Sequence, residues 1–472
     1  MYRKLSFWFA ATPLVLIVGC SGTANPTPPG SGGANGVGGA PTEGTVATGG
    51  KSSTGMGGAV AATGGGGAVA TTGGASAGSV AGACSRPVGS CTAPTVKITD
   101  VALDSAVTGY GGEGDTVNIP LAHAAIPSGG TRLAWLGTDK MVHVGQLDCD
   151  EKWVGTPFTL PAVDLQDIIA DDNGGVVLLT RDATNGGTDN CGTGTLCGGT
   201  SSPCRSMWMV RFDNTGTVTW ETQVTNLSSS LAGYQDGARF IWWYQHHGRL
   251  AFSGTNYAAF FGVAITVKNG SCVDIHEGDR LQIVSSSGAL VASGSLAVGM
   301  SHAWTSRIQW DPRTSKFAAA DATDNNCRIA IPSTATTIAQ GTCDGTLFNG
   351  DLVLSSTAGY WDAWSQGGTI RLEHFTSGAS DTTVANAGSS QHPHLVSYGA
   401  SNMLLAWQSG TGMVAQVRKA DATAATVGVQ FNIAVSDHDY LGWKPYADGS
   451  VAYAAAGSNT TSVKIARVMP CE

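Results

Sequence analysis

Two histidines of this chain stand shortly before apolar stretches that read as β-strands. His247 precedes Arg249 by two residues, and His302 precedes Arg307 by five. Imidazole titrates near neutral pH, so it serves as a general acid or base and ligates Zn, Cu and Ni. A guanidinium offers a bidentate fork to a carboxylate or a sulfate. These residue types therefore point to a polar site for an acidic ligand.

Residues at equivalent positions of repeated structural units lie on the same face of the assembled domain, which would bring these histidines and arginines together. We expect His276 to lie in a loop that opens on the same side as His247 and His302, so that these three and Arg307 converge on one face. Arg249 holds in one unit the place that Arg307 holds in the next. Both arginines are interpreted either as a ligand clamp or as ion pairs between units, and the histidines also fit as ordinary polar loop residues.

Large aromatic residues gather near the same stretches. Trp243 and Tyr244 precede His247, and Trp304 follows His302. Exposed Trp and Tyr faces stack on sugar rings, but the same residues also serve as packing between structural units. Both interpretations stay open.

Several chemistries find no support in the sequence. It has no His-x-x-x-His, HExxH or CxxC pattern and no P-loop. We therefore expect no metal and no cofactor. Residues 84–472 hold 22 basic and 33 acidic side chains, which argues against a nucleic-acid partner because a phosphate backbone needs a basic face.

The elements that must position these residues are short strands. Runs rich in Val, Ile, Leu, Ala, Trp and Tyr alternate with Gly, Asn and Asp turns, such as the hairpin signal at 213–216. A strand, a turn and a second strand of small apolar residues recur at 131–147, 249–263, 307–322, 394–408 and 442–456, with further units starting near 165 and 345. The spacing of about 56 residues predicts an all-β propeller of about seven blades, each a four-stranded antiparallel sheet. The alternative is β-sandwich domains.

One stretch carries a family resemblance. In 174–222 a strand ends in an Asp-to-Gly turn followed by a strand with Trp. This resembles blades of bacterial propellers of the pyrroloquinoline-quinone type. The likeness covers one blade and implies a fold, not an activity.

The N-terminus predicts export. Residues 1–20 join a basic start to an apolar run that is too short to span a membrane comfortably, and the run ends in Ile-Val-Gly-Cys. This ending resembles the lipobox of bacterial lipoproteins. The resemblance implies a signal peptide, lipid on Cys20, and, with Ser21 after it, location in the outer membrane. Exposure of the folded part at the cell surface is one of two orientations that the sequence leaves open.

The next segment reads as a tether. Residues 21–83 are mostly Gly, Ala, Thr and Ser, without Phe, Trp or Tyr, so they have nothing to bury and are predicted to be disordered. The domains are thus a signal peptide (1–20), a linker (21–83) and a propeller (84–472). We expect a monomer.

The cysteines fit an oxidising compartment, because ten remain after Cys20. Cys327 and Cys343 flank a short segment and form a candidate local pair. A propeller ring must bring its two ends together, so Cys84 or Cys91 is expected near Cys471, where a disulfide would latch the ring.

Two functions fit these features. The first is a binding module, in which a membrane-anchored propeller binds an extracellular glycan or protein. The second is a polysaccharide-degrading enzyme, more readily a lyase than a hydrolase. A lyase for acidic sugars needs a cation such as Arg307 or Arg249, and a base such as His302 or Tyr244.

Overall fold

The computed structural model describes most of the chain that follows the Gly-rich segment. The described residues are 84–90, 92–108, 120–187, 205–225, 248–269, 272–298, 303–323, 328–331, 336–340, 348–376, 380–388, 392–434 and 441–471. Contacts divide the chain into Met1–Gly65 and Gly66–Glu472, and every described residue belongs to the second unit. None of the described residues forms a helix that is long and apolar enough to cross a membrane. Cys20, the signal segment and the linker lie outside this part, so their predictions stay untested.

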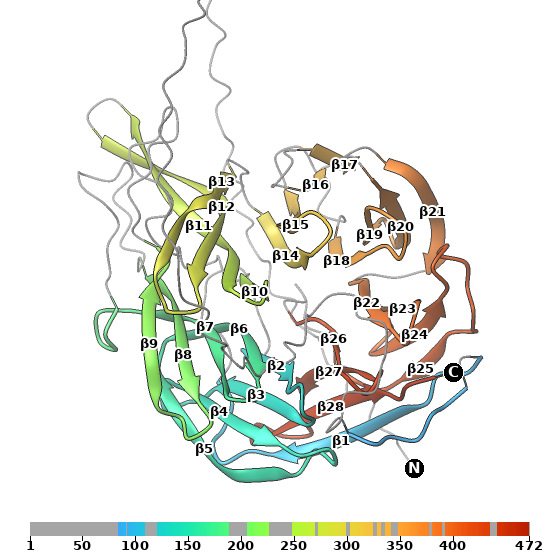
Figure 1. Ribbon diagram of the computed structural model, residues 1–472, viewed down its shortest axis with the longest axis horizontal. Coiled ribbons are helices and arrows are strands. Elements are labelled where there is room, and N and C mark those ends of the chain that lie inside the picture. Colours follow the sequence, from blue (N-terminus) through green and yellow to red (C-terminus); the bar gives the residue numbers. More distant parts are fainter. Residues whose placement is uncertain are drawn as a thin grey trace, which may run out of the picture. The chain divides into compact units, whose positions relative to one another are not determined.

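The described strands pair into seven four-stranded antiparallel sheets, here called blades 1 to 7 (Figure 1). Blades 1 to 3 contain β2 (Leu121–Ala125), β3 (Thr131–Leu136), β4 (Met141–Leu147), β5 (Trp153–Pro161), β6 (Asp164–Asp171), β7 (Gly174–Arg181), β8 (Ser206–Asp213), β9 (Val218–Gln223), β10 (Gly248–Phe252), β11 (Asn256–Asn269), β12 (Cys272–Ser285) and β13 (Leu290–Val298). Blades 4 to 6 contain β14 (Ala303–Asp311), β15 (Lys316–Thr323), β16 (Arg328–Ile331), β17 (Thr336–Gln340), β18 (Phe348–Leu354), β19 (Tyr360–Gln366), β20 (Thr369–Phe375), β21 (Ser380–Gly388), β22 (His394–Tyr398), β23 (Asn402–Ser409), β24 (Gly412–Arg418) and β25 (Val429–Phe431). Blade 7 contains β26 (Lys444–Pro445), β27 (Val451–Ala456), β28 (Ser462–Val468) and β1 (Val96–Ala102).

The first strands of the blades form a closed ring. β2, β6, β10, β14, β18, β22 and β26 each contact the next, and β26 contacts β2. β1 closes the last blade as its outer strand, pairing with β28 from Val96 opposite Val468 onward. The predicted all-β propeller of four-stranded sheets, with its two chain ends meeting in one blade, is therefore confirmed. The β-sandwich alternative is wrong, since the sheets follow one another round a ring.

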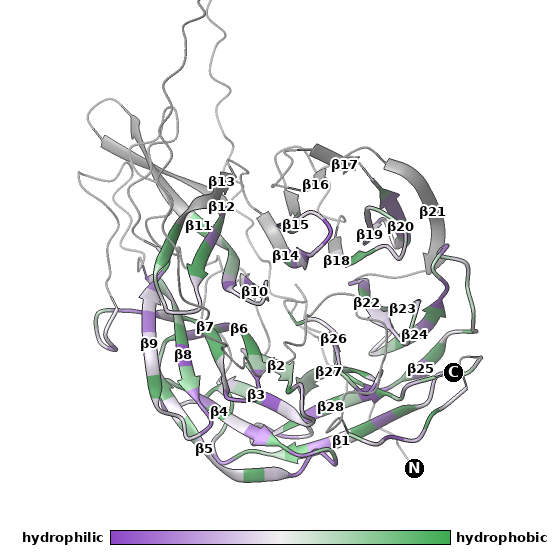
Figure 2. Cartoon of the chain, in the orientation of Figure 1, coloured by the Kyte–Doolittle hydropathy of each residue, from purple (hydrophilic) through white to green (hydrophobic). Residues whose placement is uncertain are grey.

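Burial separates the inner strands from the outer ones. Every residue of β3 and β7 is buried, because blades pack on both faces of these second strands. The outer strands β1 and β9 are mostly exposed or partly buried, with one buried residue each, and Figure 2 shows hydrophilic and hydrophobic residues interleaved along them. The second strands carry small apolar residues such as Ala134, Ala319 and Ala406, all fully buried, as the sequence predicts.

The predicted repeats match pairs of neighbouring strands in the structure, but one repeat was assigned to the wrong pair of strands within its blade. The repeats at 249–263, 307–322, 394–408 and 442–456 cover the first two strands of their blades, and the turn at 213–216 joins β8 to β9. The repeat at 131–147 is instead β3 and β4, the second and third strands of blade 1. The assignment was wrong because every hairpin of a blade shows the same strand, turn and strand pattern.

The two faces of the ring differ in their connections. On one face, which we call the turn face, the first and second strands are joined by short turns such as 172–173 and 253–255. The opposite face, which we call the connection face, carries the fourth-to-first and second-to-third connections. The strand ends on this face bound the longest intervals of sequence between strands, namely 103–120, 182–205, 224–247 and 432–443.

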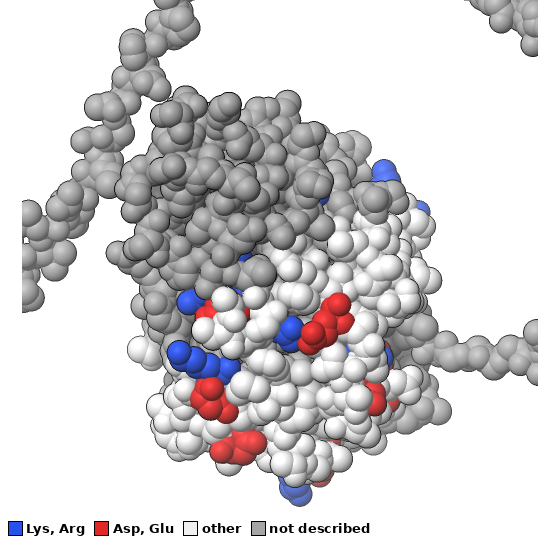
Figure 3. All heavy atoms as spheres, turned by 90° about the vertical axis from the view of Figure 1, so that its left-hand side faces the viewer, with Lys and Arg blue, Asp and Glu red and all other residues white. Residues whose placement is uncertain are grey.

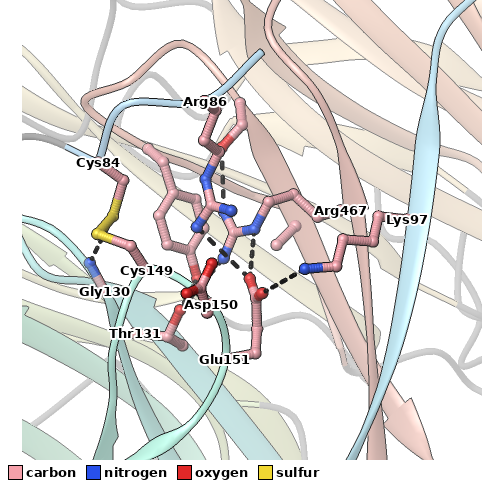
Figure 4. A network of polar contacts seen from close by, with 12 residues as sticks. Cys84, Arg86, Lys97, Gly130, Thr131, Cys149, Asp150, Glu151 and Arg467 are labelled. Carbon is pink, nitrogen blue, oxygen red and sulfur yellow. Dashed lines mark hydrogen bonds and ion pairs between the residues drawn. A yellow bond between two sulfur atoms is a disulfide. The ribbon is translucent and has the colours of Figure 1, made fainter.

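A buried network fixes the segment before β1 (Figure 4). Glu151 accepts a hydrogen bond from Nε of Arg467 at 2.7 Å and lies 3.5 Å from Nη2 of Arg86, with both arginine side chains at most 5% exposed. Arg86 also donates to Asp448 at 2.7 Å. Because these residues come from blade 1, blade 7 and the N-terminal segment, the network ties the chain end to both blades that flank the closure.

The disulfides differ from the expected latch. Cys84 bonds to Cys149 in the turn between β4 and β5, with the Cα atoms 5.5 Å apart, so it is not the partner of Cys471. The reason is that the segment before β1 crosses to blade 1, where Gly130 donates its backbone N–H to the Cys84 sulfur at 3.2 Å. Cys471 is also disulfide-bonded. Cys91, Cys327 and Cys343 lie outside the described residues, and Cys91–Cys471 stays a prediction.

Candidate functional site

The first strands of the blades bring ionisable residues together round the axis. We call these seven residues the channel polar layer: His123, Asp167, Arg249, Arg307, Asp351, His394 and Lys444. Each comes from a different blade, and most are buried. Their contacts run from blade to blade.

Asp351 of β18 joins three consecutive blades. Its carboxylate lies 2.5 Å from Nε of Arg307 on β14 and accepts a hydrogen bond from Nδ1 of His394 on β22 at 2.9 Å. The backbone N–H of Leu395 also donates to it, at 3.3 Å. Burial alone would raise the pKa of Asp351, but Arg307, His394 and the more distant Arg249 outweigh burial and hold its pKa well below the usual range.

Asp167 of β6 repeats part of this arrangement. Its carboxylate accepts hydrogen bonds from the backbone N–H of Leu250 on the next inner strand and of Ile168, both at 2.9 Å. Its cation is Lys444, whose Nζ lies 3.0 Å away. Because Lys444 belongs to blade 7, this ion pair passes over blade 1.

Both aspartates sit at a break in strand pairing. The register shifts between Leu165 and Asp167 in β6, and between Asn349 and Leu352 in β18. Such a bulge re-aims a side chain that the regular pleat would direct elsewhere. Here it turns each carboxylate toward the backbone of the following blade.

A second buried carboxyl lies near each of these aspartates. Burial raises the pKa of Asp164 to about 7, although its carboxyl accepts hydrogen bonds from Leu165 N–H and Gln166 Nε2. Burial, followed by the charges of Glu373 and Asp351, raises the pKa of Asp362 well above its usual value. Asp362 is fully buried, and neither of its oxygens has a hydrogen-bond partner among the described residues.

The structure describes only some of the residues singled out in the sequence. His247, His302, Trp243 and Tyr244 lie outside the described residues, and only the backbone of Trp304 is described, in β14. Convergence of the four predicted catalytic residues is therefore untested. Metal ligation by the predicted residues is untested as well. The described residues contain no group of three or more His, Cys, Asp or Glu side chains placed to hold a metal.

His276 does not lie in a loop. It belongs to β12, where its backbone pairs with Ile265 of β11. These two strands continue far past Phe261, near the end of the pairing with β10, so the second-to-third connection is a long hairpin. The loop assignment was wrong because the pairing of β11 with β12 extends to Asn269 and Cys272, which puts His276 inside the strand.

The two arginines occupy first strands of adjacent blades, as expected. Arg307 is buried and forms an ion pair between blades, with Asp351. Arg249 is also buried and donates through Nη1 to the carbonyl oxygens of Gly248 at 2.7 Å and Gln166 at 3.4 Å.

The acidic half of this layer was not predicted from the sequence. Asp167 and Asp351 share a signal, because each precedes two aliphatic residues in a first strand: Asp-Ile-Ile and Asp-Leu-Val. Lys444 stands in the corresponding strand of blade 7. Charged residues inside otherwise apolar first strands are therefore the sequence signal for this layer.

On the side of the molecule that Figure 3 shows, described Lys and Arg side chains lie beside Asp and Glu side chains. Among the described residues this side offers no continuous basic strip, which a phosphate backbone would require.

Comparison with known proteins gives a likeness of fold. No family model matches the chain, and no curated protein matches it. Similar solved structures include the WD40 β-propeller domain of Doa1 (10% identity, 77% of this chain and 96% of that chain, TM-score 0.38). The Neurospora crassa Pan2 WD40 domain (12%, 78% and 95%, 0.42) and a chain of the Mitotic Checkpoint Complex (13%, 82% and 95%, 0.42) are also similar. The assignment to a propeller rests on the strand order and the closed ring. The resemblance to pyrroloquinoline-quinone-type propellers stays a prediction.

Proposed function

We propose that this chain is a lipid-anchored binding module of the bacterial outer membrane, whose propeller binds an extracellular glycan or protein. The observation that carries the proposal is the difference between the two faces of the ring. On the turn face the first and second strands are joined by short turns, whereas the strand ends on the connection face bound the longest intervals of sequence between strands, 103–120, 182–205, 224–247 and 432–443. Long connections on a rigid scaffold are where binding residues concentrate.

Arg307 of the channel polar layer fits a structural role better than that of the cation of a lyase. Arg307 is 5% exposed and lies against Asp351, and Asp351 also accepts from His394. An arginine held in this way pairs neighbouring blades, whereas a lyase would need a cation presented to the carboxylate of its substrate. The arrangement therefore supplies a stiff support for the connection face.

The anchor follows from the lipobox resemblance. With lipid on Cys20, the segment 21–83 would reach about 45 Å on average as a flexible coil. Its end would meet the propeller at Cys84, which is fixed to Cys149. Cys20→Ala should remove the protein from the detergent phase of a two-phase extraction, and unchanged partitioning would contradict the anchor.

Ligand binding is tested with the full-length chain on an array of extracellular glycans. We expect retention of a defined set of glycans without any rise in absorbance at 235 nm, the signature of unsaturated uronate products. A time-dependent rise at 235 nm would instead establish the lyase. Absence of binding to any glycan would leave only a protein ligand within the proposal, and an extracellular protein array that is also negative would contradict it.

A further inference from the structure

A small, partly open pocket lies at the axis between first strands of four blades. Its polar lining consists of His123 from β2, Gln166 and Asp167 from β6, Arg249 from β10 and Lys444 from β26. Except for His123, these residues stand in the parts of their strands nearest the connection face. The pocket is thus placed to receive the end of a ligand bound on that face.

Lys444 supplies hydrogen-bond donors to this pocket. An ammonium group has three N–H donors. The described contacts of Lys444 are with the two oxygens of Asp167, at 3.0 and 3.3 Å, and a quarter of its side chain is exposed. Asp167 also accepts from the N–H groups of Ile168 and Leu250. Lys444 therefore retains capacity to donate to an anion.

Gln166 supplies an acceptor that the described part of the fold leaves unused. Its Nε2 donates to Asp164 at 2.8 Å, which fixes the orientation of the amide. Its Oε1 is buried and has no hydrogen-bond partner among the described residues. Leaving a buried acceptor unsatisfied costs free energy, so a ligand that donates a hydrogen bond here gains affinity.

The charges of the pocket favour a monoanion. Arg249 and Lys444 are cations, and Asp167 is the one carboxylate among the described lining residues. His123 is neutral, since burial, assisted by the charge of Lys444, lowers its pKa to about 3. Its Nε2 donates to the carbonyl oxygen of Ala452 at 3.0 Å. The described lining residues therefore carry one net positive charge.

We propose that this pocket binds a carboxylate that carries a neighbouring hydroxyl group, with the carboxylate on Lys444 and Arg249 and the hydroxyl donating to Gln166 Oε1. The proposal rests on the proposed function in one respect: it takes this group to be the acidic sugar of the bound glycan. It assigns the ligand class as glycans with an accessible uronate.

The test uses the full-length lipidated chain in detergent and isothermal titration with four probes: D-glucuronate, glycolate, acetate and D-glucose. We expect glucuronate and glycolate to bind, acetate to bind about tenfold more weakly because it lacks the hydroxyl, and glucose not to bind. Lack of binding by every carboxylate would overturn the proposal. Equal affinity for glycolate and acetate would overturn the role of Gln166.

Two variants and a control sharpen the result. Gln166→Met keeps the side-chain length but removes Oε1, so it should lose the preference for glycolate over acetate while acetate affinity is kept. Lys444→Gln should weaken both by at least tenfold, whereas Lys316→Gln, at an exposed position on β15, should change neither. If Lys444→Gln fails to fold, Gln166→Met still decides the outcome.

The two proposals fail in different ways. Glycan retention that survives Lys444→Gln and does not depend on uronate would leave the binding function standing and overturn the pocket assignment. If glucuronate binds in the titration but no glycan is retained on the array, the pocket assignment would stand and the glycan would be removed from the proposed function.

Discussion

The first strands of blades 2 and 5 solve the same structural problem with different cations. In β6 and β18 a bulge turns an aspartate toward the backbone of the next blade, where it accepts from Leu250 and Leu395 respectively. Asp351 is then enclosed by Arg307 and His394 from the adjacent blades. Asp167 pairs with a partly exposed cation, Lys444, from across blade 1.

This difference separates a structural role from a ligand-accessible one. A carboxylate held between a buried guanidinium and a buried imidazole joins blades, because removing it leaves the guanidinium stranded in a low dielectric. A carboxylate whose cation reaches solvent allows that cation to take part in other contacts. Blade 5 therefore holds the ring together, while blade 2 and Lys444 form the wall of a pocket.

The largest expected effect, and the most direct test of the difference between blades 2 and 5, comes from Asp351→Asn. It leaves the guanidinium of Arg307 buried without this countercharge, so we expect a loss of about 3–5 kcal/mol in the free energy of unfolding. Urea titration followed by tryptophan fluorescence measures it. Combining Asp351→Asn with Arg307→Gln should recover part of the loss, and a loss no larger than that of an exposed aspartate would contradict the role of Asp351.

The next prediction concerns pH and the second buried carboxyl of blade 5. Because the pKa of Asp362 is raised in the folded state, the wild-type protein binds a proton there that the unfolded chain has released above about pH 4. Its contribution to stability is therefore present below that pH and is lost as pH rises toward the folded pKa, at up to about 1.4 kcal/mol per pH unit. Asp362→Asn cannot ionise, so its stability relative to wild type should rise with pH.

Urea titrations of both proteins at pH 5, 6, 7 and 8 measure this difference. Glu373, Asp351 and Arg307 face Asp362 and are present in both proteins, so their titration largely cancels. Asp164→Asn provides the blade 2 counterpart. Its gain should level off above about pH 7, the value to which the pKa of Asp164 is raised. A pH-independent difference for Asp362→Asn would show that this carboxyl titrates normally.

A smaller effect comes from the residue inside each bulge. Gly350 precedes Asp351, and an added Cβ would overlap the carbonyl oxygen of Pro393 and lie 2.6 Å from that of Ala363. The equivalent position before Asp167 accommodates Gln166. Gly350→Ala should therefore cost about 2 kcal/mol through overpacking, measured by the shift in urea midpoint. Gln166→Ala, which adds no atoms, should leave the backbone of β6 unstrained, and tolerance of Gly350→Ala would contradict the close approach.

Much of the fold could be predicted because its signals are local. The hairpins at 249–263 and 394–408 show strand, turn and strand within a few residues, and closure of a ring requires its ends to meet. Which strands of blade 1 are formed by 131–147 could not be predicted from the same pattern, since the hairpin of the second and third strands of a blade looks like that of the first and second. Only pairing with β2 and β5 identifies it.

The site was less accessible to sequence reasoning because its contacts are distant along the chain. An ion pair of Arg307 between units was one of the two interpretations, but its partner, Asp351 of the next blade, was not identified. Lys444 and Asp167 are brought together only by closure of the ring. The partner in a buried ion pair is whichever charged residue lies nearby in space. A weak sequence repeat predicts which blade that residue belongs to, but not which residue it is.

Asp167 is expected to contribute less to stability than Asp351. Asp167→Asn removes the countercharge of Lys444 and one acceptor for a backbone N–H, but the ammonium of Lys444 can turn toward solvent. We therefore expect a loss of about 1–2 kcal/mol in the free energy of unfolding, less than for Asp351→Asn. A double-mutant cycle with Lys444→Gln should give a coupling energy below about 1 kcal/mol, and the cycle of Asp351 with Arg307 should give more. Equal coupling energies in the two cycles would mean that Lys444 is held in the ring as firmly as Arg307, and the pocket wall would then lose the cation that the bound carboxylate requires.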